Sequence, residues 1–151
     1  NDKPKPKEDM MSWFFALIPD TANVAIWAMI IASALPFLLA MLAKAIGGFG
    51  MADNSHPREV VAKFTGRAAR ANAAQQNSFE SLPIFLASVI VAMLFFVPQI
   101  VVNYLAVMYV ALRLMYAIAY IVNLPTLRSI VWALSMACCF MLFYLAVKMA
   151  F

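Results

Sequence analysis

The chain has 151 residues, of which 66% are hydrophobic, and a formal net charge of +4. A chain this short cannot turn so much apolar surface inward, which excludes a water-soluble globule. The basic residues have no interleaved aromatic side chains and the sequence has no glycine-rich phosphate loop, which argues against a nucleic-acid partner. With a single histidine, His56, and no cysteine pair at zinc spacing, the sequence also excludes a histidine-rich metal site.

The first 19 residues differ in composition from the rest. Residues 1–9 alternate lysine and proline with acids, which is typical of disorder. Residues 10–18 contain Trp13, Phe14 and Phe15, which suit a membrane interface, but the segment is too short to span a bilayer. We therefore expect a disordered or interfacial tail over residues 1–19, followed by one domain over residues 20–151.

Four stretches of that domain are long enough to cross a bilayer, which takes about 20 residues of helix. They mix Leu, Ala, Met and Phe freely, without the alternation of a barrel strand. The sequence thus predicts an all-α, integral-membrane four-helix bundle. The predicted spans are residues 24–46, 80–97, 100–122 and 129–151.

The connections predict how the helices are joined. Charged and apolar residues alternate at helical spacing from Arg58 to Phe79, so we expect the second helix to start near Arg58 in water and to continue without a break into the membrane. Residues 98–99 and 123–126 form short turns, which makes consecutive spans antiparallel neighbours. Most lysines and arginines lie in the first and third connections, and the positive-inside rule places both in the cytoplasm.

A polar stripe runs along the third span. Arg113 lies near its middle, where a cation costs about 2.5–3.5 kcal/mol even on the mildest insertion scale and so needs a partner or a task. Tyr109, Arg113, Tyr116 and Tyr120 are separated by 4, 3 and 4 residues, which places them on one helix face.

A matching stripe lies on the second helix. Arg67, Arg70, Asn77 and Glu80 are separated by 3, 7 and 3 residues and share one face. Counted from the turn between the two helices, Glu80 and Arg113 lie at similar depth, so Glu80 is the expected partner of Arg113. A structural ion pair that fixes the register of the bundle would explain both residues.

A ligand site is the alternative explanation. Guanidinium groups bind carboxylates bidentately, a carboxylate accepts from an ammonium group, and an asparagine amide can both donate and accept. Several cations, one anion and several neutral donors suit a small zwitterionic, net anionic ligand better than a proton wire or an ion channel. The residues expected at this site are Arg70, Asn77, Glu80, Arg113, Tyr116, Tyr120, Arg128 and Ser129.

Residues 66–83, GRAARANAAQQNSFESLP, resemble the signature of the MAPEG family (membrane-associated proteins in eicosanoid and glutathione metabolism), especially its bacterial branch. The spacing of Arg113, Tyr116 and Tyr120 and the Arg128-Ser129 pair are similar to that family's third and fourth helices. The resemblance covers residues 20–151. It implies a homotrimer in a bacterial inner membrane that holds glutathione between neighbouring subunits.

The resemblance also implies individual roles. Asn77 and Glu80 match residues that hold the polar ends of glutathione, and Arg113 and Tyr120 match further pocket residues. Arg128 matches the arginine responsible for the thiolate, so we predict it as the catalytic residue. The predicted glutathione-binding residues are Arg70, Asn77, Glu80, Arg113, Tyr116, Tyr120 and Ser129.

Some positions depart from the family pattern. Ala73 stands where eicosanoid-forming members have arginine, although Arg70 lies one turn earlier, and Trp132 and Ala133 replace tyrosine and threonine hydroxyls. We expect a membrane glutathione transferase or peroxidase that acts on lipophilic electrophiles or lipid hydroperoxides. The missing hydroxyls motivate the alternative, a non-catalytic structural or accessory subunit of a larger membrane complex.

Overall fold

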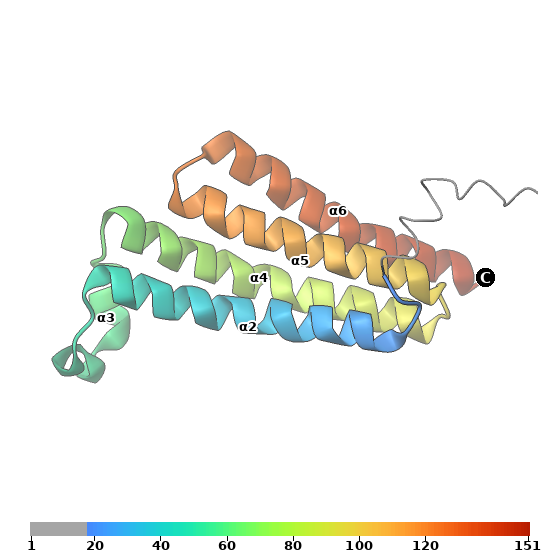
Figure 1. Cartoon of the computed structure of the whole chain (residues 1–151), viewed down its shortest axis with the longest axis horizontal. Helices are drawn as coiled ribbons and strands as arrows, with labels where there is room; N and C mark the ends of the chain where they lie inside the picture. Colours follow the sequence, from blue (N-terminus) through green and yellow to red (C-terminus); the bar gives the residue numbers. More distant parts are fainter. Residues whose placement is uncertain (1–17) are drawn as a thin grey trace, which may run out of the picture.

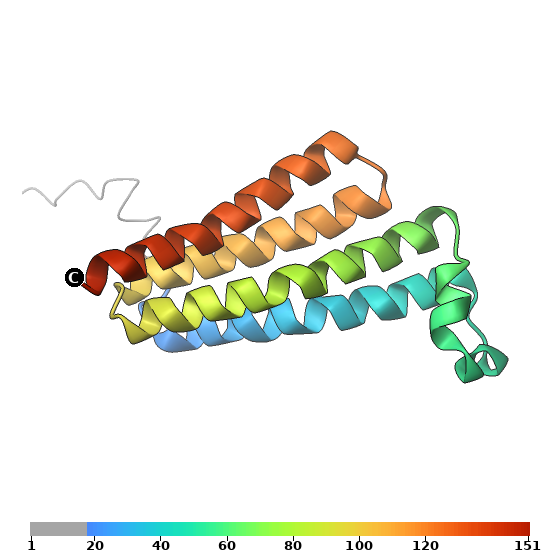
Figure 2. The same cartoon turned by 180° about the vertical axis from the view of Figure 1, so that it is seen from behind.

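The computed structural model describes residues 18–151, so that residues 1–17 of the predicted tail lie outside the described part. Four long helices run alternately up and down along one axis (Figures 1 and 2), which confirms the predicted all-α four-helix bundle. A 3₁₀-helix and a short helix stand between the first two. The elements are α2 (Ala22–Gly47), η1 (Met51–Ser55), α3 (Pro57–Ala62), α4 (Gly66–Leu94), α5 (Gln99–Ile121) and α6 (Pro125–Met149).

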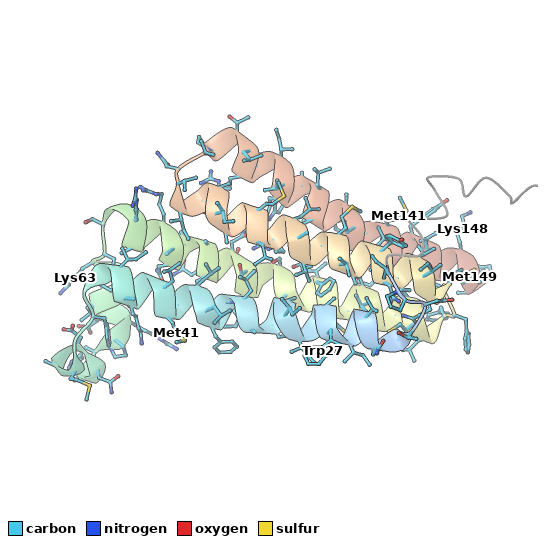
Figure 3. The ribbon with its side chains drawn as sticks, in the orientation of Figure 1. Trp27, Met41, Lys63, Met141, Lys148 and Met149 are labelled. Atoms are coloured by element: carbon cyan, nitrogen blue, oxygen red, sulfur yellow. The ribbon has the colours of Figure 1, made fainter. Side chains whose placement is uncertain are left out.

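All four long helices have the length and the apolar composition to cross a membrane. Their outer faces carry large apolar side chains: Trp27 on α2 and Met141 on α6, for example, are 61% and 48% exposed and point away from the bundle (Figure 3). The inner face of α2 is instead lined by small residues such as Ala25, Ala28 and Ala32, which let neighbouring helices approach closely. This apolar-outside, small-inside pattern is that of an integral membrane protein.

The core fills the space between the helices in two clusters. In the larger one the rings of Phe85 on α4 and Tyr109 on α5 stack in parallel, with centroids 3.9 Å apart. The smaller cluster includes Leu39, Tyr116 and Val131 and lies nearer the end of the bundle that carries α3. The polar residues of α4 and α5 therefore stand directly beside packed apolar layers.

The second helix differs from its prediction. The expected continuous helix from Arg58 is interrupted after Ala62, and α4 begins only at Gly66. The Phe64 ring packs so closely on Gly47 that a Cβ there would lie 2.5 Å from a ring atom, and Gly66 turns the chain with a φ of +58°. Helical periodicity could not reveal this break, because it depends on a contact with the end of α2.

The two short turns are as predicted and make α5 an antiparallel neighbour of both α4 and α6. Asn123 adopts the left-handed conformation at the end of α5 (φ 66°), and the Leu124 N–H donates to the Ala119 carbonyl at 2.8 Å. Asparagine is a common residue at this position because it tolerates a positive φ. At the other end of the bundle, the buried Asn103 amide donates to the carbonyls of Pro19 and Thr21 and so fixes the start of α2 to α5.

Candidate functional site

Polar contacts set the register between α4 and α5. Near the end of α5, Arg70 Nε donates to the Ile121 carbonyl at 2.9 Å. Two helical turns deeper, Arg113 Nη2 donates to Asn77 Oδ1 at 3.0 Å. The spacing is consistent, because seven residues along α4 and eight along α5 both correspond to about two turns. The polar stripes of the two helices therefore face each other.

Arg113 is almost completely enclosed, with 1% of its surface exposed. Its Nη2 also donates to Ser78 Oγ at 3.0 Å, and its guanidinium lies 4.3 Å from the centre of the Tyr116 ring. Nη1 is buried without a hydrogen-bond partner in the described part of the chain. A buried cation with incomplete pairing is costly, so its retention needs a reason beyond packing.

The expected contact between Glu80 and Arg113 is bridged rather than direct. Asn77 stands between them: its oxygen accepts from Arg113, and its Nδ2 donates to Glu80 Oε2 at 3.3 Å. Glu80 itself is exposed on the outer face of α4. Glu80 on α4 and Arg113 on α5 lie at similar depth in the bundle, as predicted. The Glu80 side chain is exposed, however, whereas that of Arg113 is buried.

A row of cations and aromatic rings extends from Arg113 toward the start of α6. The Tyr116 and Tyr120 rings meet edge to face with centroids 5.6 Å apart. The Arg128 guanidinium lies 4.6 Å from the centre of the Tyr120 ring. Contacts of this kind orient a guanidinium by attraction to the ring face. Arg128 is thus held in place, and no carboxylate of residues 18–151 forms a salt bridge with it.

These groups surround a cavity of about 510 Å³ between α4, α5 and α6. It lies near the end of the bundle where α6 slants away from α2 and α4 (Figures 1 and 2). Its volume falls within the range of about 300–1,000 Å³ that is usual for small-molecule sites. The lining residues are Asn77, Tyr116, Tyr120, Arg128, Ser129, Trp132 and Ala133.

The structure brings five of the eight predicted site residues to this cavity. Arg113 lies behind the wall, where it holds Asn77 and contacts Tyr116, and Glu80 lies beside Asn77 on the outer surface. Arg70 does not line the cavity, and its Nε is bonded to the Ile121 carbonyl. The five that line it are Asn77, Tyr116, Tyr120, Arg128 and Ser129.

Sequence reasoning missed the hydroxyl groups that complete the buried network. Ser78 accepts from Arg113, and Ser81 Oγ accepts from the Tyr109 hydroxyl at 3.2 Å. Ser78 and Ser81 each follow a predicted site residue, Asn77 or Glu80, by one position. Serine side chains of membrane helices hydrogen-bond to neighbouring helices, so their position beside predicted site residues was the signal that could have identified them.

The cavity combines one cation with neutral donors. Arg128 supplies a fixed positive charge, and Tyr116, Tyr120 and Ser129 supply hydroxyl groups. Within residues 18–151, no group of three or more potential metal ligands occurs. Arginine stays protonated and so cannot act as a base. The arrangement can therefore bind an anion or stabilise a developing negative charge.

The fold defines the class of protein: an integral-membrane four-helix bundle with a polar cavity near one end. Residues 24–148 match the MAPEG family model. Because this match covers most of the chain, the protein belongs to the MAPEG family, the membrane-associated proteins in eicosanoid and glutathione metabolism. A comparison with curated proteins finds no match.

Proposed function

We propose that the protein is a membrane glutathione transferase or peroxidase that acts on lipophilic electrophiles or lipid hydroperoxides. The observation that carries the proposal is the cavity in which Arg128, held against Tyr120, stands beside the hydroxyls of Tyr116 and Ser129. Family membership supports glutathione as the co-substrate. The bilayer concentrates lipophilic substrates, which is a physical reason to place such a site among membrane helices.

The chemistry follows from the charge of Arg128. A thiol is nucleophilic only as the thiolate; its free pKa is near 8.5, and an adjacent cation lowers it to about 3.5–7.5. Arg128 would stabilise the thiolate electrostatically while the proton leaves to water. Holding thiolate and electrophile together supplies proximity, and the sulfur forms a bond to the electrophilic carbon as the leaving group departs with its bonding electrons. With a hydroperoxide, the sulfur takes the terminal oxygen, the O–O bond breaks and the lipid alcohol leaves. A second glutathione then reduces the sulfenic acid, which gives glutathione disulfide and water.

Asn77 and Glu80 are proposed to hold the polar ends of glutathione. The Asn77 amide lines the cavity, and Glu80 lies next to it with its carboxylate exposed on α4. This carboxylate could accept hydrogen bonds from the γ-glutamyl ammonium group. Arg113, which holds Asn77 from behind, acts in this scheme as a positioning residue. Tyr116, Tyr120 and Ser129 are proposed as further ligands, and binding by Arg70 stays a prediction.

The exposure of Glu80 supports a homotrimer with the site between subunits. Ile84, one turn after Glu80 on the same outer part of α4, is 37% exposed. A carboxylate that faces hydrocarbon is expensive. A second copy of the chain packed on this face would remove Glu80 from lipid and enclose the ligand.

We further propose a bacterial inner membrane, with the first and third connections in the cytoplasm. Lys63 and Lys148 mark the two ends of the bundle (Figure 3), and the end with Lys63 carries most of the described basic residues. This distribution supports the assignment through the positive-inside rule.

The experiment measures glutathione conjugation and peroxide reduction by purified full-length protein in lipid nanodiscs. We expect Arg128→Ala to lower the turnover at least about a hundredfold, the usual effect of removing one group that stabilises developing charge. Lys148→Ala, at the opposite end of the bundle, is the matched control and should keep full activity. Full activity in Arg128→Ala would refute the assigned role. Absence of both activity and glutathione binding in the unmodified protein would favour the structural-subunit alternative.

A further inference from the structure

A second pocket lies between α2, α3 and α4 and shares no lining residue with the cavity described above. Its volume is about 460 Å³, again within the range of small-molecule sites. Lys44 from α2 and Arg58 from α3 face it, together with the amide side chains of Asn72, Gln75 and Gln76 from α4. None of these groups takes part in the proposed glutathione chemistry.

The pocket is positively charged. Two cations line it and, among the residues that the structure describes, no acidic side chain does. Lys44 Nζ lies 4.4 Å from the centre of the Phe49 ring, a contact that holds the ammonium group without neutralising it. The three amides add N–H donors. Two cations and several neutral donors around one space are the groups that recognise a phosphate ester.

The position of the pocket also indicates which kind of ligand fits it. Lys44 lies in the last turn of α2, at the surface end of a membrane-spanning helix. About two turns deeper than Lys44 along α2, the rings of Phe37 and Phe79 meet edge to face across α2 and α4, with centroids 5.4 Å apart. Both rings are exposed, Phe37 by 61% and Phe79 by 39%. The cationic pocket and the exposed aromatic pair therefore follow each other along the surface that α2 and α4 form.

We propose that this pocket binds an anionic phospholipid. The phosphate of the headgroup lies between Lys44 and Arg58, the headgroup oxygens accept from the amides of α4, and an acyl chain runs over Phe37 and Phe79. Basic pockets between membrane helices bind anionic headgroups by this combination of charge and depth. A free phosphate would use the same cations, but it would have no use for the adjoining aromatic pair.

The experiment counts bound lipid on the full-length protein by native mass spectrometry, with phosphatidylglycerol, phosphatidylcholine and inorganic phosphate as separate probes. We expect retained phosphatidylglycerol and little phosphatidylcholine. In Lys44→Gln/Arg58→Gln, phosphatidylglycerol affinity should fall about thirtyfold, as expected for two cations near a membrane surface. Lys63→Gln/Arg67→Gln removes the same charge from the same segment, outside the pocket lining, and should retain the lipid.

Further variants keep the test independent of folding. Lys44→Arg in an otherwise unmodified chain preserves the charge and should retain phosphatidylglycerol binding. Phe37→Ala should weaken phosphatidylglycerol binding without changing the binding of inorganic phosphate. Circular dichroism identifies any variant that has lost its helices. Equal losses of phosphatidylglycerol binding in the two double variants would show that only the overall positive charge of the segment matters, and would overturn the proposal. So would tight binding of inorganic phosphate that excludes phosphatidylglycerol.

Discussion

Arg113 shows how one residue connects stability with the proposed function. Its guanidinium is buried and bonded to Asn77 and Ser78 through Nη2, and Nη1 has no hydrogen-bond partner among residues 18–151. Taking a charge out of water costs several kcal/mol, and an apolar side chain of similar size does not carry that cost. A residue whose burial opposes folding, yet which holds a cavity-lining amide in place, is better explained by positioning than by packing.

This explanation predicts separate effects in Arg113→Met. The midpoint of thermal unfolding in detergent should stay the same or rise, because the incompletely paired cation is removed. Glutathione affinity, measured by titration calorimetry, should fall about tenfold, since one charge-assisted hydrogen bond of about 1.5–3 kcal/mol no longer fixes Asn77. Arg113→Lys, which keeps the charge, is the control. A large drop in the unfolding midpoint with unchanged affinity would show that Arg113 is purely structural.

Sequence reasoning at the residue scale identified most of the cavity lining but not its connectivity. Asn77, Tyr116 and Arg128 follow from helical spacing and from the cost of polar groups in hydrocarbon. Spacing gives the face and depth of a side chain, but its rotamer decides which neighbour it reaches. For that reason Asn77, and not Glu80, contacts Arg113, and Arg70 bonds the end of α5.

At the scale of elements, hydropathy predicted the four spans to within a few residues, except for the start of the second. The long helix expected from Arg58 is divided because Phe64 packs on Gly47 and because Gly66 adopts the left-handed backbone conformation. The periodicity of a single segment cannot show that Gly47, at the end of α2, contacts Phe64, which lies before α4.

Gly47→Ala tests this contact. The new methyl group would lie 2.5 Å from the Phe64 ring, so the ring must move. We expect residues 48–65 to become more accessible to a protease while the helical content stays unchanged. In the Phe64→Ala background the same change should have little further effect, because coupled sites are not additive. Limited proteolysis followed by mass spectrometry measures this, and equal cleavage of Gly47→Ala and the unmodified chain would contradict it.

At the scale of the molecule, α4 organises two polar sites. One side of it contributes Asn77 to the cavity with α5 and α6, and another contributes Asn72, Gln75 and Gln76 to the pocket with α2 and α3. Its outer face carries Glu80. The helix thus separates the proposed glutathione site from the proposed lipid site. Hydropathy predicted the bundle and helical spacing predicted most of the lining of the first cavity, whereas the shape of neither cavity could be predicted, because both depend on how helices diverge at their ends.

The most direct measurement of the proposed function is the ultraviolet difference spectrum of glutathione bound to the purified protein near neutral pH, where free glutathione is mostly the thiol. The unmodified protein should show the absorbance of the thiolate. Arg128→Ala should lose this absorbance while calorimetry still detects bound glutathione. A bound thiol without thiolate absorbance in the unmodified protein, or an equal thiolate signal in Arg128→Ala, would contradict the proposal that Arg128 generates the nucleophile.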